Sequence, residues 1–384
     1  MTETFDLSIR TRLIGGRGSA TAQAPRAARD LDLERVYLVT DRATRETGKV
    51  QPVADALEAA GVNVTAIHDE VPAGGDAGIA EEIAMLAGEA GADGFVSIGP
   101  GVVTAMTKAA ALIHSHGGAL ADHADPDSIK GALKPHLAIA ILPGPAAEVT
   151  ASCAVGDGAG GLVRIASRFL QPDVAILDPD FLEGGRPIRV VAGGFLALAR
   201  AVEGLVSRRA SPFSDGLHAS ALATTAAALP GAGTPGEEGA PARGALLYAS
   251  AEAGLGFNAS ASGAAGALAE ALATLAGTPP GAAAAALLPG VVEAWGDGVA
   301  DGRWRLLADL LGATTSDATG VATALRALRD RAGLPAELLA AGSSGDALEA
   351  VVSLALADPA ISGSPRDPEA GWLREVLAAL RARG

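Results

Sequence analysis

A glycine-containing turn between a predicted strand and a predicted helix is the first candidate for chemistry. It reads Gly99-Pro-Gly-Val102, and Lys108 follows in the predicted helix. Such a turn binds phosphate because backbone N–H groups and the helix dipole converge on the anion, and glycine allows a close approach. Gly99 and Gly101 keep that approach, but Pro100 has no N–H and Val102 has no hydroxyl. The turn is either an eroded nucleotide site or an ordinary strand-to-helix connection.

Three histidines form a second candidate group. His114 and His116 lie two positions apart, His123 follows, and aspartates are nearby. Metal ligation needs several donors around one point, whereas residues two apart lie on different faces of a helix. We interpret the group as part of a solvated loop. The sequence also contains no Gly-x-Ser-x-Gly, Walker or His-Glu-x-x-His motif.

Charge and composition narrow the possible partners. The chain of 384 residues has 29 basic and 44 acidic residues, a net charge of -15 that repels phosphate backbones and anionic membranes. We therefore expect no nucleic acid partner and no membrane association. A single cysteine, Cys153, and acidic residues where a signal peptide would be basic predict a cytoplasmic protein. Only four basic residues are lysines, and this arginine excess, with abundant Ala and Gly, indicates a bacterial origin.

The first half alternates short apolar runs with amphipathic stretches, which is typical of a doubly wound, Rossmann-like α/β domain. We expect a hairpin between 152 and 165. The expected strands are 36–40, 62–67, 94–98, 137–142 and 174–177, and the expected helices are 50–60, 78–90 and 102–114. Glycines near the helix ends fit C-terminal caps.

The second half has no strand-like alternation and predicts an all-helical domain. Its expected helices are 189–208, 215–229, 245–253, 263–276 and several more towards the C-terminus. Residues 230–244 and 357–371 are rich in Pro and Gly and are expected to be surface loops. We place the domains at 1–182, α/β and dinucleotide-binding-like, and at 183–384, all helical.

An ordered set of local motifs resembles the iron-containing alcohol dehydrogenase family, including its maleylacetate reductase branch and the related dehydroquinate-synthase-like fold. The set covers nearly the whole chain, although no single motif is specific. Its members are Thr11–Gly18, Leu38–Asp41, Gly99–Val102 with Lys108, Pro172–Pro179, Gly194–Glu203, Ser211–Asp215, Ala253–Phe257, Leu287–Pro289 and Ser364–Arg366. The resemblance implies a nucleotide site formed by Asp41, Gly99, Gly101 and Lys108.

The resemblance also locates a metal site, where this chain departs from the family pattern. Family members hold iron or zinc with one Asp and three His. The corresponding positions here are Leu196, Arg200, Gly266 and Pro280. These side chains supply no metal donor, and Arg200 brings a permanent positive charge. We therefore expect no metal cofactor at this position.

Two charged residues replace histidines around the same pocket. Arg200 stands at a ligand position, and Glu270 stands where the family has a histidine near the reacting alcohol. Burying either charge alone is costly, so we predict that Arg200 contacts Glu270. In the alternative, both side chains reach solvent from helix ends.

Two functions remain open. In the favoured one, the chain is a non-catalytic member that binds a partner, as a homodimer or as a heterodimer with an active relative, or binds a peptide or small molecule in the interdomain cleft. A bacterial biosynthetic pathway is the setting we consider for this function. In the other, it is a metal-independent NAD(P)-dependent alcohol dehydrogenase in which Arg200 polarises the carbonyl and Glu270 relays the proton. Binding of NAD(P) is doubtful, because the second cofactor segment is shortened to Pro143–Glu148 and has no hydroxyl side chain.

Overall fold

The computed structural model describes residues 4–334 and 348–383 and contains two compact units. One unit comprises residues 9–142 and 146–184. The other takes residues 4–8, 143–145 and the described chain from Gly185 onwards. The contact division thus falls at Gly184 and Gly185, and the three-residue segment Pro143–Pro145 belongs to the second unit.

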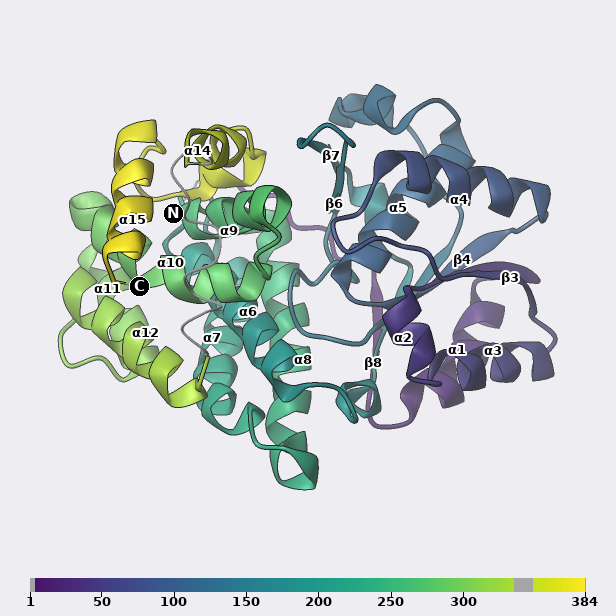
Figure 1. Cartoon of the computed structure of the whole chain (residues 1–384), viewed down its shortest axis with the longest axis horizontal. Coiled ribbons are helices and arrows are strands. Elements are labelled where there is room, and N and C mark those ends of the chain that lie inside the picture. Colours follow the sequence, from purple (N-terminus) through teal and green to yellow (C-terminus); the bar gives the residue numbers. More distant parts are fainter. Residues whose placement is uncertain (1–3, 335–347, 384) are drawn as a thin grey trace. The chain divides into compact units, whose positions relative to one another are not determined.

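The first unit is a parallel α/β sheet covered by helices on both faces (Figure 1). The strand order is β1-β8-β5-β4-β2-β3, and a separate antiparallel hairpin is formed by β6 and β7. The strands are β1 (Arg12–Gly15), β2 (Arg35–Val39), β3 (Asn63–His68), β4 (Gly94–Gly99), β5 (His136–Ala140), β6 (Ser152–Gly156), β7 (Leu162–Ala166) and β8 (Val174–Leu177). The α-helices are α1 (Ser19–Asp30), α2 (Arg42–Glu46), α3 (Val50–Ala59), α4 (Ala77–Glu89) and α5 (Gly101–His116). The expected α/β class, strands and hairpin are confirmed.

Alternate side chains of each central strand enter different cores, as the strand period of two requires. In β2, Val36 and Leu38 pack in the core under α1 and α3, whereas Tyr37 and Val39 pack in the core under α4 and α5. Both cores are built largely from alanine and branched aliphatic residues. The sheet is therefore buried on both faces, as is usual for parallel sheets.

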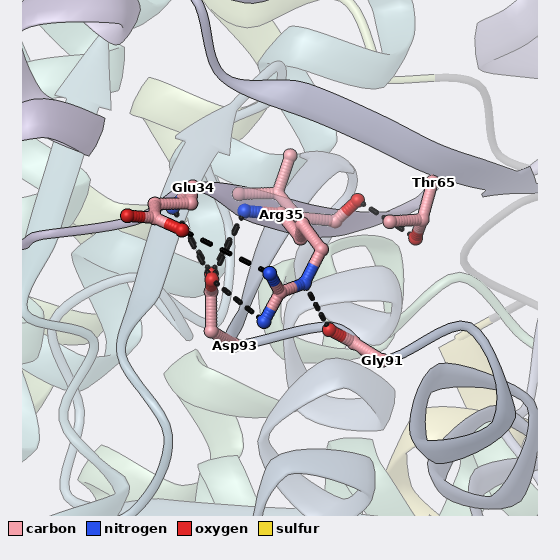
Figure 2. A network of polar contacts seen from close by, with 6 residues as sticks. Glu34, Arg35, Thr65, Gly91 and Asp93 are labelled. Carbon is pink, nitrogen blue, oxygen red and sulfur yellow. Dashed lines mark hydrogen bonds and ion pairs between the residues drawn. The ribbon is translucent and has the colours of Figure 1, made fainter.

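Polar contacts fix the register of β2 and β4 at their amino ends (Figure 2). The carboxylate of Asp93 accepts hydrogen bonds from the backbone N–H groups of Glu34 and Arg35, the latter at 3.0 Å. The Arg35 side chain donates to the carbonyl of Gly91 at 2.6 Å and lies 3.7 Å from Asp93. One carboxylate thus caps the start of β2.

The second unit is helical throughout its described part, as expected (Figure 1). Its α-helices are α6 (Pro187–Val206), α7 (Pro212–Ala232), α8 (Gly236–Ser260), α9 (Ala264–Ala276), α10 (Pro280–Trp295), α11 (Asp301–Leu311), α12 (Ala318–Ala332), α14 (Leu348–Leu356) and α15 (Ala370–Arg383). No helix in the described ranges is long and apolar enough to cross a membrane.

Both expected surface loops need correction. Most of 230–244 is helical, because α7 continues to Ala232 and α8 begins at Gly236. The reason is Arg243, which is only 2% exposed and donates to the carbonyls of Thr234 and Gly236 at 2.6 and 2.7 Å. Residues 357–371 are mostly irregular, but Ile361 and Ser364 are buried, so this segment is not a simple surface loop.

Candidate functional site

The four positions that the resemblance assigns to the family's metal ligands lie on three helices of the helical unit. Leu196 and Arg200 are half-buried on α6, Gly266 is half-buried on α9, and Pro280 is exposed at the start of α10. The Gly266 N–H donates a hydrogen bond to Glu203 at 3.1 Å. Leucine, glycine and proline side chains have no donor atom for a metal, and a guanidinium repels one. These residues do not fit the iron or zinc of the family.

Arg200 is anchored by two groups of its own unit. Its guanidinium donates to the carbonyl of Pro145 and lies 4.4 Å from the centre of the Phe257 ring. The first contact ties α6 to Pro143–Pro145, and the second ties it to α8 through a cation–π interaction. The predicted contact between Arg200 and Glu270, which is half-buried on α9, stays a prediction.

The Pro143–Pro145 segment is held by further contacts with the helical unit. Ser250 of α8 accepts a hydrogen bond from the Gly144 N–H at 2.9 Å and donates to the Gly144 carbonyl at 3.2 Å. A Cβ atom at Gly193 would lie 2.0 Å from the Pro143 carbonyl oxygen, so only glycine allows this approach. Sequence reasoning treated this segment as an eroded cofactor loop and missed its role as an anchor for Arg200.

A buried carboxylate, Glu203, lies one turn after Arg200 on α6 and caps the start of α9. It is 1% exposed and accepts hydrogen bonds from Ala265 N–H at 2.7 Å and from the Ser262 hydroxyl at 2.8 Å, besides the Gly266 bond. Burial raises the pKa of Glu203, and the hydrogen bonds from Ala265, Ser262 and Gly266 oppose that rise. Glu203 is the single acidic residue in the mostly apolar stretch 190–206, and this pattern could have indicated a buried carboxylate.

Replacing Glu203 with Gln is expected to reduce the free energy of unfolding by about 1 to 3 kcal/mol. One carboxylate oxygen accepts a hydrogen bond from the Ala265 N–H, and the other accepts from the Ser262 hydroxyl and the Gly266 N–H. In the Gln variant the NH₂ group replaces one of these oxygens, so two hydrogen-bond donors face each other. Urea denaturation at pH 7 measures the loss. Glu375→Gln, at an exposed position of α15, is the control and is expected to change little. Equal stabilities of the two variants would contradict the capping role.

His218 of the helical unit has no assigned role in the sequence analysis, and the structure places it near enough to Arg200 to feel that charge. It is fully buried on α7, and its Nε2 lies 2.8 Å from the Ser260 hydroxyl. Burial, with a smaller effect of the Arg200 charge, lowers the pKa of His218 to about 3. The ring lies between Gly204 of α6 and Gly256 of α8, where added Cβ atoms would come within 2.1 and 2.7 Å of it. His218 is therefore a neutral packing residue.

The predicted phosphate turn is a tight connection in the α/β unit. Pro100 lies between β4 and α5, and its carbonyl accepts the Val103 N–H at 2.8 Å. A Cβ atom at Gly99 would lie 2.5 Å from a Val103 methyl group. Packing alone therefore requires this glycine, and Gly101 begins α5. The nucleotide role of Gly99 and Gly101 stays a prediction.

The other two predicted cofactor residues bind groups of the protein. Lys108 is 1% exposed, and its ammonium donates to the carbonyls of Thr150 and Ser152 at 2.7 and 3.0 Å. Asp41 caps α2 and accepts hydrogen bonds from the N–H and hydroxyl of Thr44 at 2.9 and 2.7 Å. Their roles toward a nucleotide stay predictions.

The histidine group of the first unit is explained by local bonds. His123 Nε2 lies 2.9 Å from the Gly117 carbonyl oxygen, and His114 Nδ1 lies 3.2 Å from that of Ala84. The described residues contain no cluster of three or more His, Cys, Asp or Glu that could hold a metal ion. The interpretation as a solvated loop is wrong, because His114 and His116 belong to α5 and His123 is buried.

Comparisons with known proteins cover both units. The model "Iron-containing alcohol dehydrogenase" matches residues 10–179, and "Fe-containing alcohol dehydrogenase family, C-terminal" matches residues 190–381. Lactaldehyde reductase of Escherichia coli K12 is 30% identical over 364 residues, covering 92% of this chain and 93% of the relative. A crystal structure of 1,3-propanediol oxidoreductase has a TM-score of 0.92 at 25% identity, covering 98% of this chain and 100% of that one.

A further structure is similar in fold. Sulfoacetaldehyde reductase from Bifidobacterium kashiwanohense in complex with NAD+ has a TM-score of 0.85 at 22% identity, with both chains fully covered. The two family models and the lactaldehyde reductase match extend over nearly all of this chain. The chain therefore belongs to the iron-containing alcohol dehydrogenase family.

Proposed function

We propose that this chain is a non-catalytic member of the iron-containing alcohol dehydrogenase family that acts as a binding or partner subunit. The proposal rests on the predicted replacement of all four family ligand positions, and the observation that supports it is the placement of Arg200. The Arg200 guanidinium is bound to the Pro145 carbonyl and stacked on Phe257. A cation held in this way stabilises the local fold and excludes a second cation from its surroundings.

The nucleotide-binding elements support the same proposal. The turn after β4 presents Pro100 where a backbone donor is needed, and the side chains of Lys108 and Asp41 bind neighbouring protein groups. Several relatives have names that describe dehydrogenases or reductases, one of them NAD-dependent. A chain that has lost both metal donors and cofactor donors retains the scaffold, which can form a dimer with itself or with an active relative. We place it in the cytoplasm.

Elemental analysis and nucleotide titration test the proposal together. We expect no stoichiometric iron or zinc after purification and reconstitution, and no binding of NAD, NADH, NADP or NADPH at micromolar concentrations by isothermal titration. The E. coli lactaldehyde reductase, treated in parallel, is the positive control. About one metal per chain, or micromolar affinity for any of the four nucleotides, would overturn the proposal.

The metal-independent dehydrogenase is the competing outcome. In that case the protein would turn over an alcohol or aldehyde with a nicotinamide nucleotide and without metal. Glu270→Gln and Arg200→Lys would abolish turnover at unchanged melting temperature, because both side chains would act on the substrate. If the parent protein shows no turnover and both variants melt at a lower temperature, the two residues have a structural role.

A further inference from the structure

We draw no further inference here: the strongest candidate, the outer edge of β1 with the exposed side chains of Ile9 and Leu13, is an unpaired apolar edge of the sheet in the described part of the chain, and nothing in the structure shows what covers it.

Discussion

Lowering the pH from 7 to 5 is expected to destabilise the protein by about 4 kcal/mol through His136 and His218. Burial lowers the pKa of each residue to about 3, with smaller effects from Lys108 on His136 and from Arg200 on His218. In the unfolded chain both titrate near their ordinary value of about 6.5. As the pH falls below that value, the unfolded state binds two protons that the folded state does not bind. Stability is therefore lost progressively between about pH 6.5 and pH 3.

Urea denaturation between pH 7 and pH 5 measures this effect. Glu203 and Asp173 act in the opposite direction, because burial raises their pKa values and the folded state takes up protons first. Comparison with single variants gives the contribution of each histidine to the pH dependence of stability. His218→Gln and His136→Gln should each reduce the pH dependence by about 2 kcal/mol over this range, whatever their effect at pH 7. His116→Gln, at an exposed position, is the control. Parallel pH profiles for the parent and both buried-site variants would show that these histidines are protonated in the fold.

Gly204→Ala is expected to destabilise the helical unit by about 3 kcal/mol. The new Cβ atom would lie 2.1 Å from Nε2 of His218, whose ring is fully buried and bonded to Ser260. Gly256 of α8 also lies close to the ring, since a Cβ atom there would come within 2.7 Å of it. Guanidinium chloride unfolding measures the change in the free energy of unfolding.

Two further variants make the Gly204 result specific. Gly216→Ala, in α7 with open space around it, is the matched control and should stabilise by about 0.5 to 1 kcal/mol. The double variant Gly204→Ala with His218→Ala should be more stable than the sum of the two single effects predicts, because the methyl group occupies part of the emptied volume. Additive effects would contradict direct packing between the two residues.

The α/β unit was predictable because its signals are local. The strands β2, β4 and β5 are short β-branched or apolar runs between glycine-capped helices, and each lies within two residues of its expected bounds. The same reasoning gave a wrong prediction, a surface loop, for residues 230–244. Their Pro and Gly content favours a loop, but the buried Arg243 satisfies the carbonyls of a tight turn and allows α7 and α8 to continue. These bonds from Arg243 to carbonyls nine and seven residues earlier in the chain leave no periodic signal in the sequence.

The site was predictable only in part. Motif order led us to assign Leu196, Arg200, Gly266 and Pro280 to the family's ligand positions, and this assignment stays a prediction. Motif order could not reveal that Arg200 binds Pro145, which is 55 residues away in the chain, or that it stacks on Phe257. Nor could it distinguish a phosphate-binding glycine from Gly99, which the adjacent Val103 requires for packing. These contacts depend on tertiary packing, which spacing in the sequence does not encode.

The anchoring of Pro143–Pro145 has a consequence for biosynthesis. These three residues leave the ribosome before the chain that completes the α/β unit, yet their partners Arg200 and Ser250 are made much later. More than a hundred further residues are synthesised before Ser250 is available to bind Gly144. A gene split between Gly184 and Gly185 would place this segment and its partners on different polypeptides. Neither product would then contain all of the residues of the helical unit.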